Sequence, residues 1–267
     1  MPFADVDGVS LYYEDSGGAG TPVLFSHGLL MSSAMFAAQV AALAPRYRCI
    51  AYDHRGQGKS ADPGGRIHTI EQCYDDAVKL IERLGIGPCH FVGLSMGGFV
   101  GMRIAARRPG LLRSLVLLET SADPEPSENV GRYTLLNAVA RWFGIGAVVS
   151  RVMPIMFGRH FLTESSRAAE RDAWRKRLAG NGRHIVRAVR GVIERTGVAK
   201  ELTGVRTPTL VLVGDQDVAT PQPKAERIVS LIPGATLMII PNAGHSSSVE
   251  QPEVVTAAIA GFIGALP

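Results

Sequence analysis

The stretch FVGLSMGG, residues 91–98, carries the strongest local pattern in the chain. Glycines stand two positions before and two positions after Ser95. An apolar run precedes the stretch and helical periodicity follows it, so Ser95 is expected at a sharp turn from a strand into a helix. Small residues at Gly93 and Gly97 avoid the steric clash that such a turn creates. A serine in a glycine-rich turn can also simply cap a helix. The flanking strand and helix favour a nucleophilic hydroxyl, helped by the helix dipole.

Around this stretch, short apolar runs alternate with segments of helical periodicity. We expect strands at the apolar runs, which are Val9–Glu14, Val23–Ser26, Arg48–Tyr52, His90–Gly93, Arg113–Leu118, Thr209–Val213 and Thr236–Ile240. We expect helices at Ser33–Leu43, Ile70–Leu84, Met96–Arg107, Pro223–Leu231 and about 252–263. Short, continuous apolar strands joined by helices indicate an α/β fold with a mostly parallel, twisted sheet covered on both faces.

The alternation breaks once, between residues 121 and 200, where helical patterns continue without a convincing strand. We expect a helical insertion there, in a core domain formed by residues 1–120 and 201–267. From Glu125 to Lys200 the chain has fourteen Lys and Arg against six Asp and Glu, a net charge of +8, whereas the whole chain carries +4. A basic segment can attract nucleic acid, anionic lipid or an acidic substrate. Because it has no nucleic-acid motif, no nucleic-acid partner is expected.

Length and composition are those of an ordinary globular enzyme. The chain has 267 residues, of which 46% are hydrophobic and 19% charged. The three cysteines, Cys49, Cys73 and Cys89, show no CxxC spacing, so neither a disulfide framework nor a metal site is expected. No apolar run approaches the roughly 20 residues that span a bilayer, and the first residues lack the pattern of a secretory signal. We therefore expect a cytoplasmic protein with no membrane partner.

A serine hydroxyl is a poor nucleophile and needs a general base. His245 ends the segment PNAGH, which follows the last expected strand and precedes the last expected helix. That position places it in a loop at the sheet edge where Ser95 is expected, and makes it the predicted base.

The acid that orients the histidine is expected after the strand Thr209–Val213. Two aspartates stand there, Asp215 directly after the strand and Asp217 farther into the loop. We favour Asp217, because a residue farther into the loop can turn toward His245 and hold its imidazole in the correct tautomer. Asp215 and Glu119, which ends the preceding strand, remain alternatives.

An oxyanion formed at Ser95 requires two backbone N–H donors. One is expected from Met96, the residue after the nucleophile, and the other from Leu29, in the loop after the strand Val23–Ser26. Gly28 would allow that loop to turn tightly. The chemistry requires no metal and no other cofactor.

Taken together, these motifs resemble the α/β-hydrolase family over nearly the whole chain. The matching segments, in family order, are His27-Gly28, DHRGQGKS at 53–60, GLSMGG at 93–98, Gly214-Asp215-Gln216-Asp217 and Gly244-His245. The resemblance implies the α/β-hydrolase fold with a helical lid over the site. Within the family the chain is similar to small carboxylesterases and 3-oxoadipate enol-lactonase-like hydrolases. Serine rather than aspartate at position 95 argues against a dehalogenase or an epoxide hydrolase. Leu29 and Leu30 lack the aromatic residue usual in cofactor-free haloperoxidases.

The predicted function is hydrolysis of a small-molecule ester or lactone through an acyl-enzyme on Ser95. One alternative is C–C bond hydrolysis of a diketone by the same residues, and another is a non-catalytic receptor that kept the pocket. A carboxylate-bearing substrate would suit the basic insertion. Pocket-lining candidates, each of which could instead be helix core, are Leu30, Trp142, Phe143, Met153, Met156 and Phe157.

Overall fold

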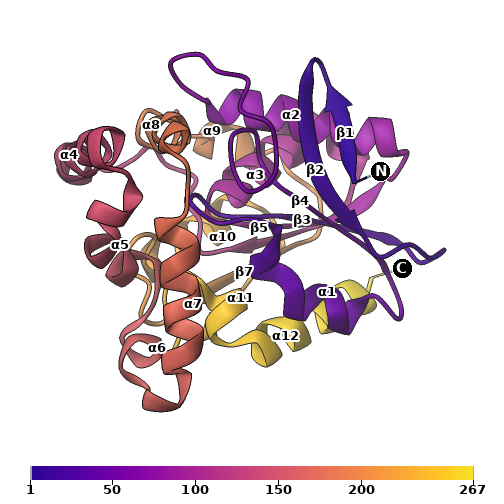
Figure 1. Cartoon of the computed structure of the whole chain (residues 1–267). Helices are drawn as coiled ribbons and strands as arrows, with labels where there is room; N and C mark the ends of the chain where they lie inside the picture. The colour runs from indigo at the N-terminus through magenta and orange to yellow at the C-terminus, as the bar shows by residue number, and fades with distance from the viewer. Residues whose placement is uncertain (1, 267) are drawn as a thin grey trace.

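A computed structural model describes residues 2–266, and its centre is a mostly parallel sheet (Figure 1). In these residues the sheet has eight strands in the order β1-β2-β4-β3-β5-β6-β7-β8. The strands are β1 (Phe3–Val6), β2 (Val9–Asp15), β3 (Pro22–Ser26), β4 (Arg48–Tyr52), β5 (Cys89–Leu94), β6 (Leu112–Leu118), β7 (Thr209–Gly214) and β8 (Thr236–Ile240). Strands β3 to β8 run parallel, whereas β1 and β2 pair antiparallel at one edge.

Helices cover both faces of the sheet. Outside the insertion they are α1 (Ala37–Leu43), α2 (Ile70–Leu84), α3 (Met96–Arg107), α9 (Ala199–Leu202), α10 (Gln222–Leu231), α11 (Ser247–Glu250) and α12 (Pro252–Gly264). Helix α1 packs on α12 and α2 packs on α3, and Figure 1 shows these two pairs on opposite sides of the sheet. Successive residues of β5 point to opposite faces, so Phe91 joins the core under α2 and α3 and Val92 the core under α1 and α12. The fold therefore has two apolar cores.

All seven expected strands and all five expected helical segments form within a few residues of their predicted bounds. The structure adds β1, which pairs with β2 through a tight turn in which Asp7 and Gly8 have φ of 51° and 79°. The expected helix Ser33–Leu43 begins as a 3-10 turn, Ser33–Phe36, before α1.

The helical insertion, defined here as α4 to α8, lies between β6 and β7. It comprises α4 (Ser127–Phe143), α5 (Val149–Met156), α6 (Arg159–Thr163), α7 (Ala168–Ala179) and α8 (Val186–Ile193). Figure 1 shows it beside one end of the sheet, with α4 outermost. No helix in residues 2–266 is both long and apolar enough to cross a membrane.

Candidate active site

Ser95 stands at the turn between β5 and α3 in a strained backbone conformation. Its φ is 51° and its ψ is −108°, a conformation that costs about 1–3 kcal/mol for a residue with a side chain. The neighbouring glycines permit this turn: a Cβ on Gly97 would lie 2.0 Å from the carbonyl oxygen of Ser26, and one on Gly93 would lie 2.4 Å from that of Gly97. Thr120 fixes the turn further, because its Oγ1 donates to the Ser95 carbonyl at 2.8 Å.

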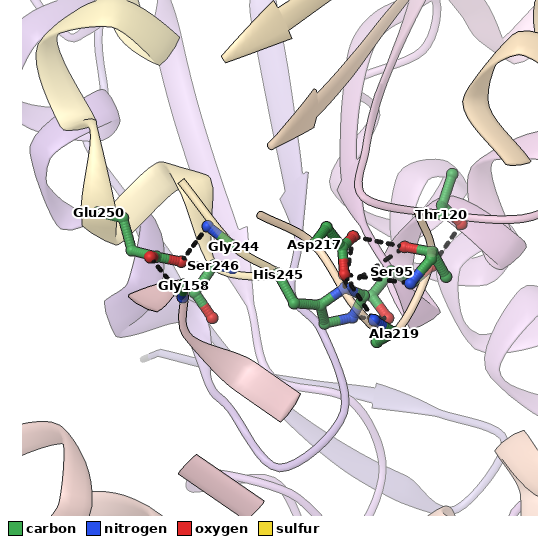
Figure 2. A network of polar contacts seen from close by, with 10 residues as sticks. Ser95, Thr120, Gly158, Asp217, Ala219, Gly244, His245, Ser246 and Glu250 are labelled. Carbon is green, nitrogen blue, oxygen red and sulfur yellow. Dashed lines mark hydrogen bonds and ion pairs between the residues drawn. The ribbon is translucent and has the colours of Figure 1, made fainter. Parts of the chain in front are cut away.

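The structure brings Ser95, His245 and Asp217 into one chain of hydrogen bonds (Figure 2). Nε2 of His245 lies 2.8 Å from Oγ of Ser95. Nδ1 of the same ring lies 3.1 and 3.0 Å from the two carboxylate oxygens of Asp217. All three side chains are buried. The ring is thus placed with one nitrogen toward a carboxylate and the other toward a hydroxyl.

Asp217 is held as a carboxylate by its own hydrogen bonds. It accepts the N–H groups of Ala219 and Thr220 at 2.8 and 3.1 Å, and the Thr220 hydroxyl at 2.8 Å. Burial raises the pKa of Asp217, but His245 and the bonds from Thr220 outweigh burial, so the pKa lies below its ordinary value. An ionised Asp217 requires a proton on Nδ1 of His245, which leaves Nε2 free to accept the proton of Ser95.

The two alternative acids lie close to this network without a hydrogen bond to His245. Asp215 accepts the N–H of Ala243 at 3.3 Å. Glu119 is fully buried at the end of β6, where hydrogen bonding to Ser247 and Gly214 only partly opposes the effect of burial on its pKa. Burial, and next the charge of Asp217, raise the pKa of Glu119 well above its ordinary value.

The loop after β3 presents the second predicted backbone donor. A Cβ on Gly28 would lie only 3.5 Å from the Cβ of Ser95, so this loop passes directly beside the serine. In the described part of the chain, neither Leu29 nor Met96 donates its backbone N–H to another group. The next residue, Leu30, has a φ of 67° and donates its N–H to Oε1 of Gln57 at 2.9 Å.

A cavity of about 130 Å³ opens at Ser95 and His245, between the sheet edge and the insertion. Its wall is mostly aliphatic, and of the six predicted lining residues it includes Leu30 and Met156. The other aliphatic lining residues are Leu29, Leu136, Ala140, Ile145, Val148, Val152, Ile155, Ala219, Val189, Val192 and Ile193.

Four of the predicted lining residues lie elsewhere. Trp142 and Phe143 are 69% and 73% exposed, because α4 turns Leu136 and Ala140 toward the cavity and these two aromatic side chains away from it. Met153 and Phe157 are buried outside the cavity wall, and the Phe157 ring stacks on Phe161 and lies 6.3 Å from Trp174. These four residues therefore do not line the cavity, contrary to the prediction.

A family model described as the alpha/beta hydrolase family matches residues 23–258. The chain belongs to this family. A curated relative from Caulobacter sp. (strain K31), named "Putative carbamate hydrolase RutD", is 31% identical and covers 98% of both chains. A thermophilic esterase from Thermogutta terrifontis superposes with a TM-score of 0.88 at 30% identity, covering 99% of this chain and 97% of its own. An enol-lactonase from Burkholderia xenovorans LB400 superposes with a TM-score of 0.91 at 28% identity, covering 98% and 100%.

In this α/β hydrolase the cavity wall also contains a buried ion pair that the sequence did not indicate. Nη1 of Arg195 donates to Oε2 of Glu125 at 2.7 Å, and the two side chains are only 3% and 8% exposed. The guanidinium lies over the Phe99 ring, 4.3 Å from its centre. Burial lowers the pKa of Arg195, and Glu125 opposes that shift. Phe99 follows Ser95 by one helical turn, so the pair lies near the network of Ser95, His245 and Asp217.

The sequence did not indicate three further residues that support the network of Ser95, His245 and Asp217. Gln57 holds the Leu29–Leu30 loop, Thr220 holds Asp217, and Glu250 binds backbone groups on both sides of His245. Gln57 lies in DHRGQGKS, one of the segments that carry the family resemblance, so that motif was the available signal. Thr220 and Glu250 belong to none of the motifs found in the sequence.

Proposed function

We propose that this α/β hydrolase cleaves a carboxylic ester or lactone through an acyl-enzyme on Ser95. The observation that carries the proposal is the hydrogen-bond chain from Ser95 through His245 to Asp217 at the mouth of an apolar cavity. Such a chain activates a hydroxyl that is otherwise a weak nucleophile.

In the proposed reaction, Oγ of Ser95 attacks the substrate carbonyl while Nε2 of His245 takes its proton. The resulting oxyanion accepts the N–H groups of Leu29 and Met96, which have no other partner among the described residues. His245 then returns the proton to the leaving oxygen. A water molecule, activated by the same nitrogen, releases the acyl group from Ser95. Asp217 stays ionised throughout and stabilises the imidazolium.

The aliphatic wall supports a substrate with an apolar group next to its reacting carbonyl, because burying such a group is favourable. The similarity to an esterase and an enol-lactonase supports an ester or lactone over other acyl compounds. In the proposal, residues 121–200 act as a lid over a core formed by residues 1–120 and 201–267. The enzyme would act in the cytoplasm without a cofactor.

A second candidate is a carbamate ester, favoured by the 31% identical RutD relative. The same serine attack serves a carbamate carbonyl, so the two candidates differ in the substrate and not in the catalytic residues. C–C hydrolysis of a diketone and a receptor without turnover are further outcomes that an experiment can separate from these.

The decisive experiment measures turnover of p-nitrophenyl esters, lactones, an alkyl carbamate and a ring-cleavage diketone by the wild type and by Ser95→Ala. We expect ester or lactone turnover that Ser95→Ala abolishes, and rapid labelling of the wild type by a fluorophosphonate. Turnover of only the carbamate or only the diketone would replace the proposed substrate. A folded protein that neither turns over any compound nor reacts with the fluorophosphonate would overturn the proposal.

A further inference from the structure

The carboxylate of Glu250 connects the helical insertion to the loop of His245. Its Oε1 accepts the N–H groups of Gly244 and Ser246 at 3.0 and 3.1 Å, and its Oε2 accepts the N–H of Gly158 at 2.8 Å. Figure 2 shows these hydrogen bonds beside the Ser95, His245 and Asp217 network. Glu250 is 1% exposed. One buried side chain thus binds three backbone groups from two separate segments.

Two of the three bonded groups directly flank His245. When the N–H groups of residues 244 and 246 are held by one oxygen, the backbone between them has little freedom to rotate. The orientation of the imidazole toward Ser95 depends on that backbone, because only the Cα–Cβ and Cβ–Cγ torsions lie between the main chain and the ring. Displacement of catalytic groups by about 1 Å can cost roughly 100-fold in rate.

The third bond reaches the insertion just before α6. A Cβ on Gly244 would lie 2.1 Å from the nitrogen of Gly158, so these two backbones are in direct contact. A second link joins the same part of the insertion to the loop of Asp217, because the N–H of His160 donates to Oε1 of Gln216 at 2.9 Å. Residues 158–160 are therefore linked to the His245 loop through the side chain of Glu250, and to the Asp217 loop through Gln216.

Burying a carboxylate is costly unless hydrogen bonds compensate it. Within residues 2–266, every hydrogen bond accepted by the Glu250 side chain comes from the His245 loop or from Gly158. The cost is thus offset only by fixing these two segments relative to each other. Apolar packing at this position could stabilise the fold without specifying the loop.

We propose that Glu250 is a positioning residue that couples the helical insertion to His245 and sets the approach of its imidazole to Ser95. The inference rests on the proposed function, since His245 is taken as the base. It implies that the insertion contributes to the rate of the chemical step and not only to substrate binding.

The test compares Glu250→Gln with Gln39→Ala. The glutamine keeps the size of the side chain but has one acceptor oxygen, so either the His245 loop or Gly158 loses its acceptor. Gln39 supports the same α11 turn by donating to the carbonyl of Ser248 at 3.1 Å. It contacts neither amide beside His245, which makes Gln39→Ala a control for general destabilisation.

The readouts, taken at pH 8 so that Glu250 of the wild type is ionised, are kcat, KM, the melting temperature and the rate constant for Ser95 labelling by a fluorophosphonate. Labelling requires no known substrate. We expect Glu250→Gln to lower kcat and the labelling rate by roughly 10–100-fold, with KM changed by less than about twofold. Gln39→Ala should lower the melting temperature while kcat and labelling stay near the wild type.

An unlabelled wild type would mean that the proposed function fails before Glu250 is tested. If the wild type is labelled and folded Glu250→Gln is labelled equally fast, the proposed function stands and the coupling is refuted. The coupling is also refuted if Gln39→Ala loses as much kcat per degree of lost melting temperature as Glu250→Gln does. Should Glu250→Gln fail to fold, Glu250→Asp, which keeps the charge and shortens the reach, must show the same loss of labelling rate.

Discussion

Both carboxylate oxygens of Asp217 lie within hydrogen-bonding distance of Nδ1 of His245, at 3.1 and 3.0 Å. We expect Asp217→Asn to lower kcat by about 10³–10⁴-fold, because an amide at this position favours the wrong imidazole tautomer. The fall should be measured on the best substrate of the panel, with circular dichroism as a control for folding. A loss of less than tenfold would show that another group orients the histidine.

Glu119 provides the matched test of the alternative acid. Burial and the charge of Asp217 raise the pKa of its carboxyl well above the ordinary value, which favours the protonated form. Glu119→Gln keeps the size and shape of the side chain and removes its ability to ionise. We expect kcat within about threefold of the wild type and little change in the free energy of unfolding. A large loss of kcat in a folded variant would transfer the role of the acid to Glu119.

The two sides of α4 predict different effects of the same substitution. Ala140 lines the cavity, so Ala140→Phe should fill it and lower kcat/KM for long acyl chains at least about tenfold more than for acetyl esters. Leu135 is 66% exposed on the outer side of the same helix. Leu135→Phe should leave the ratio of kcat/KM values between long and short esters unchanged. Equal losses for all chain lengths would place the acyl group outside this cavity.

The Arg195–Glu125 pair predicts a non-additive effect on stability. Arg195→Met leaves the carboxylate of Glu125 buried without its partner, which should lower the free energy of unfolding by about 3–5 kcal/mol. The double variant Arg195→Met/Glu125→Leu should recover most of that loss, because no buried charge remains. Urea titrations of the four proteins in the cycle measure the coupling. Additive losses would show that water already solvates the pair.

Glu250 predicts a pH dependence of stability. Burial raises its pKa to about 7 from an ordinary value of 4.5, against its three backbone hydrogen bonds and helped by the charge of Asp217. The folded state therefore binds this proton more tightly than the unfolded state. Its contribution to the free energy of unfolding is full below about pH 4.5 and is lost as the pH rises toward 7.

Denaturant titrations of the wild type and Glu250→Gln at pH 5 and pH 8 measure this contribution. Glutamine does not titrate, and Asp217 and Glu119 are present in both proteins. We therefore expect the wild type to lose stability relative to the variant between pH 5 and pH 8. The raised pKa would be contradicted if the difference in free energy of unfolding between the two proteins were the same at both pH values, or if the wild type gained stability relative to the variant at pH 8.

The parts of the fold and site that the sequence predicted are those encoded locally. The turn at Ser95 requires glycines two positions away, where even a Cβ would contact backbone, so sequence neighbours reveal it. His245 and Asp217 each follow a strand of a parallel sheet, and the ends of such strands meet at one edge. The order of the strands along the chain and the local patterns were therefore sufficient to predict that these residues meet.

What the sequence did not predict depends on contacts between distant segments. Glu250 bonds Gly158 across 92 residues, and Arg195 bonds Glu125 across 70. Helix α4 has apolar residues on both sides, with Leu136 toward the cavity and Trp142 toward the surface. Its sequence therefore did not indicate which side faces Ser95, and the aromatic residues were assigned to the wrong one.

The helical insertion has two parts that should differ in how freely they can be exchanged between related enzymes. One part is the pair of helices α4 and α8, and the other is the segment at α6, with residues 158–160. Helices α4 and α8 pack on each other and line the cavity. We expect specificity to be redesigned most safely by replacing these two helices. The segment at α6 is linked to the His245 loop through Glu250 and to the Asp217 loop through Gln216. A chimera that replaces it would therefore also exchange contacts that hold the proposed catalytic residues.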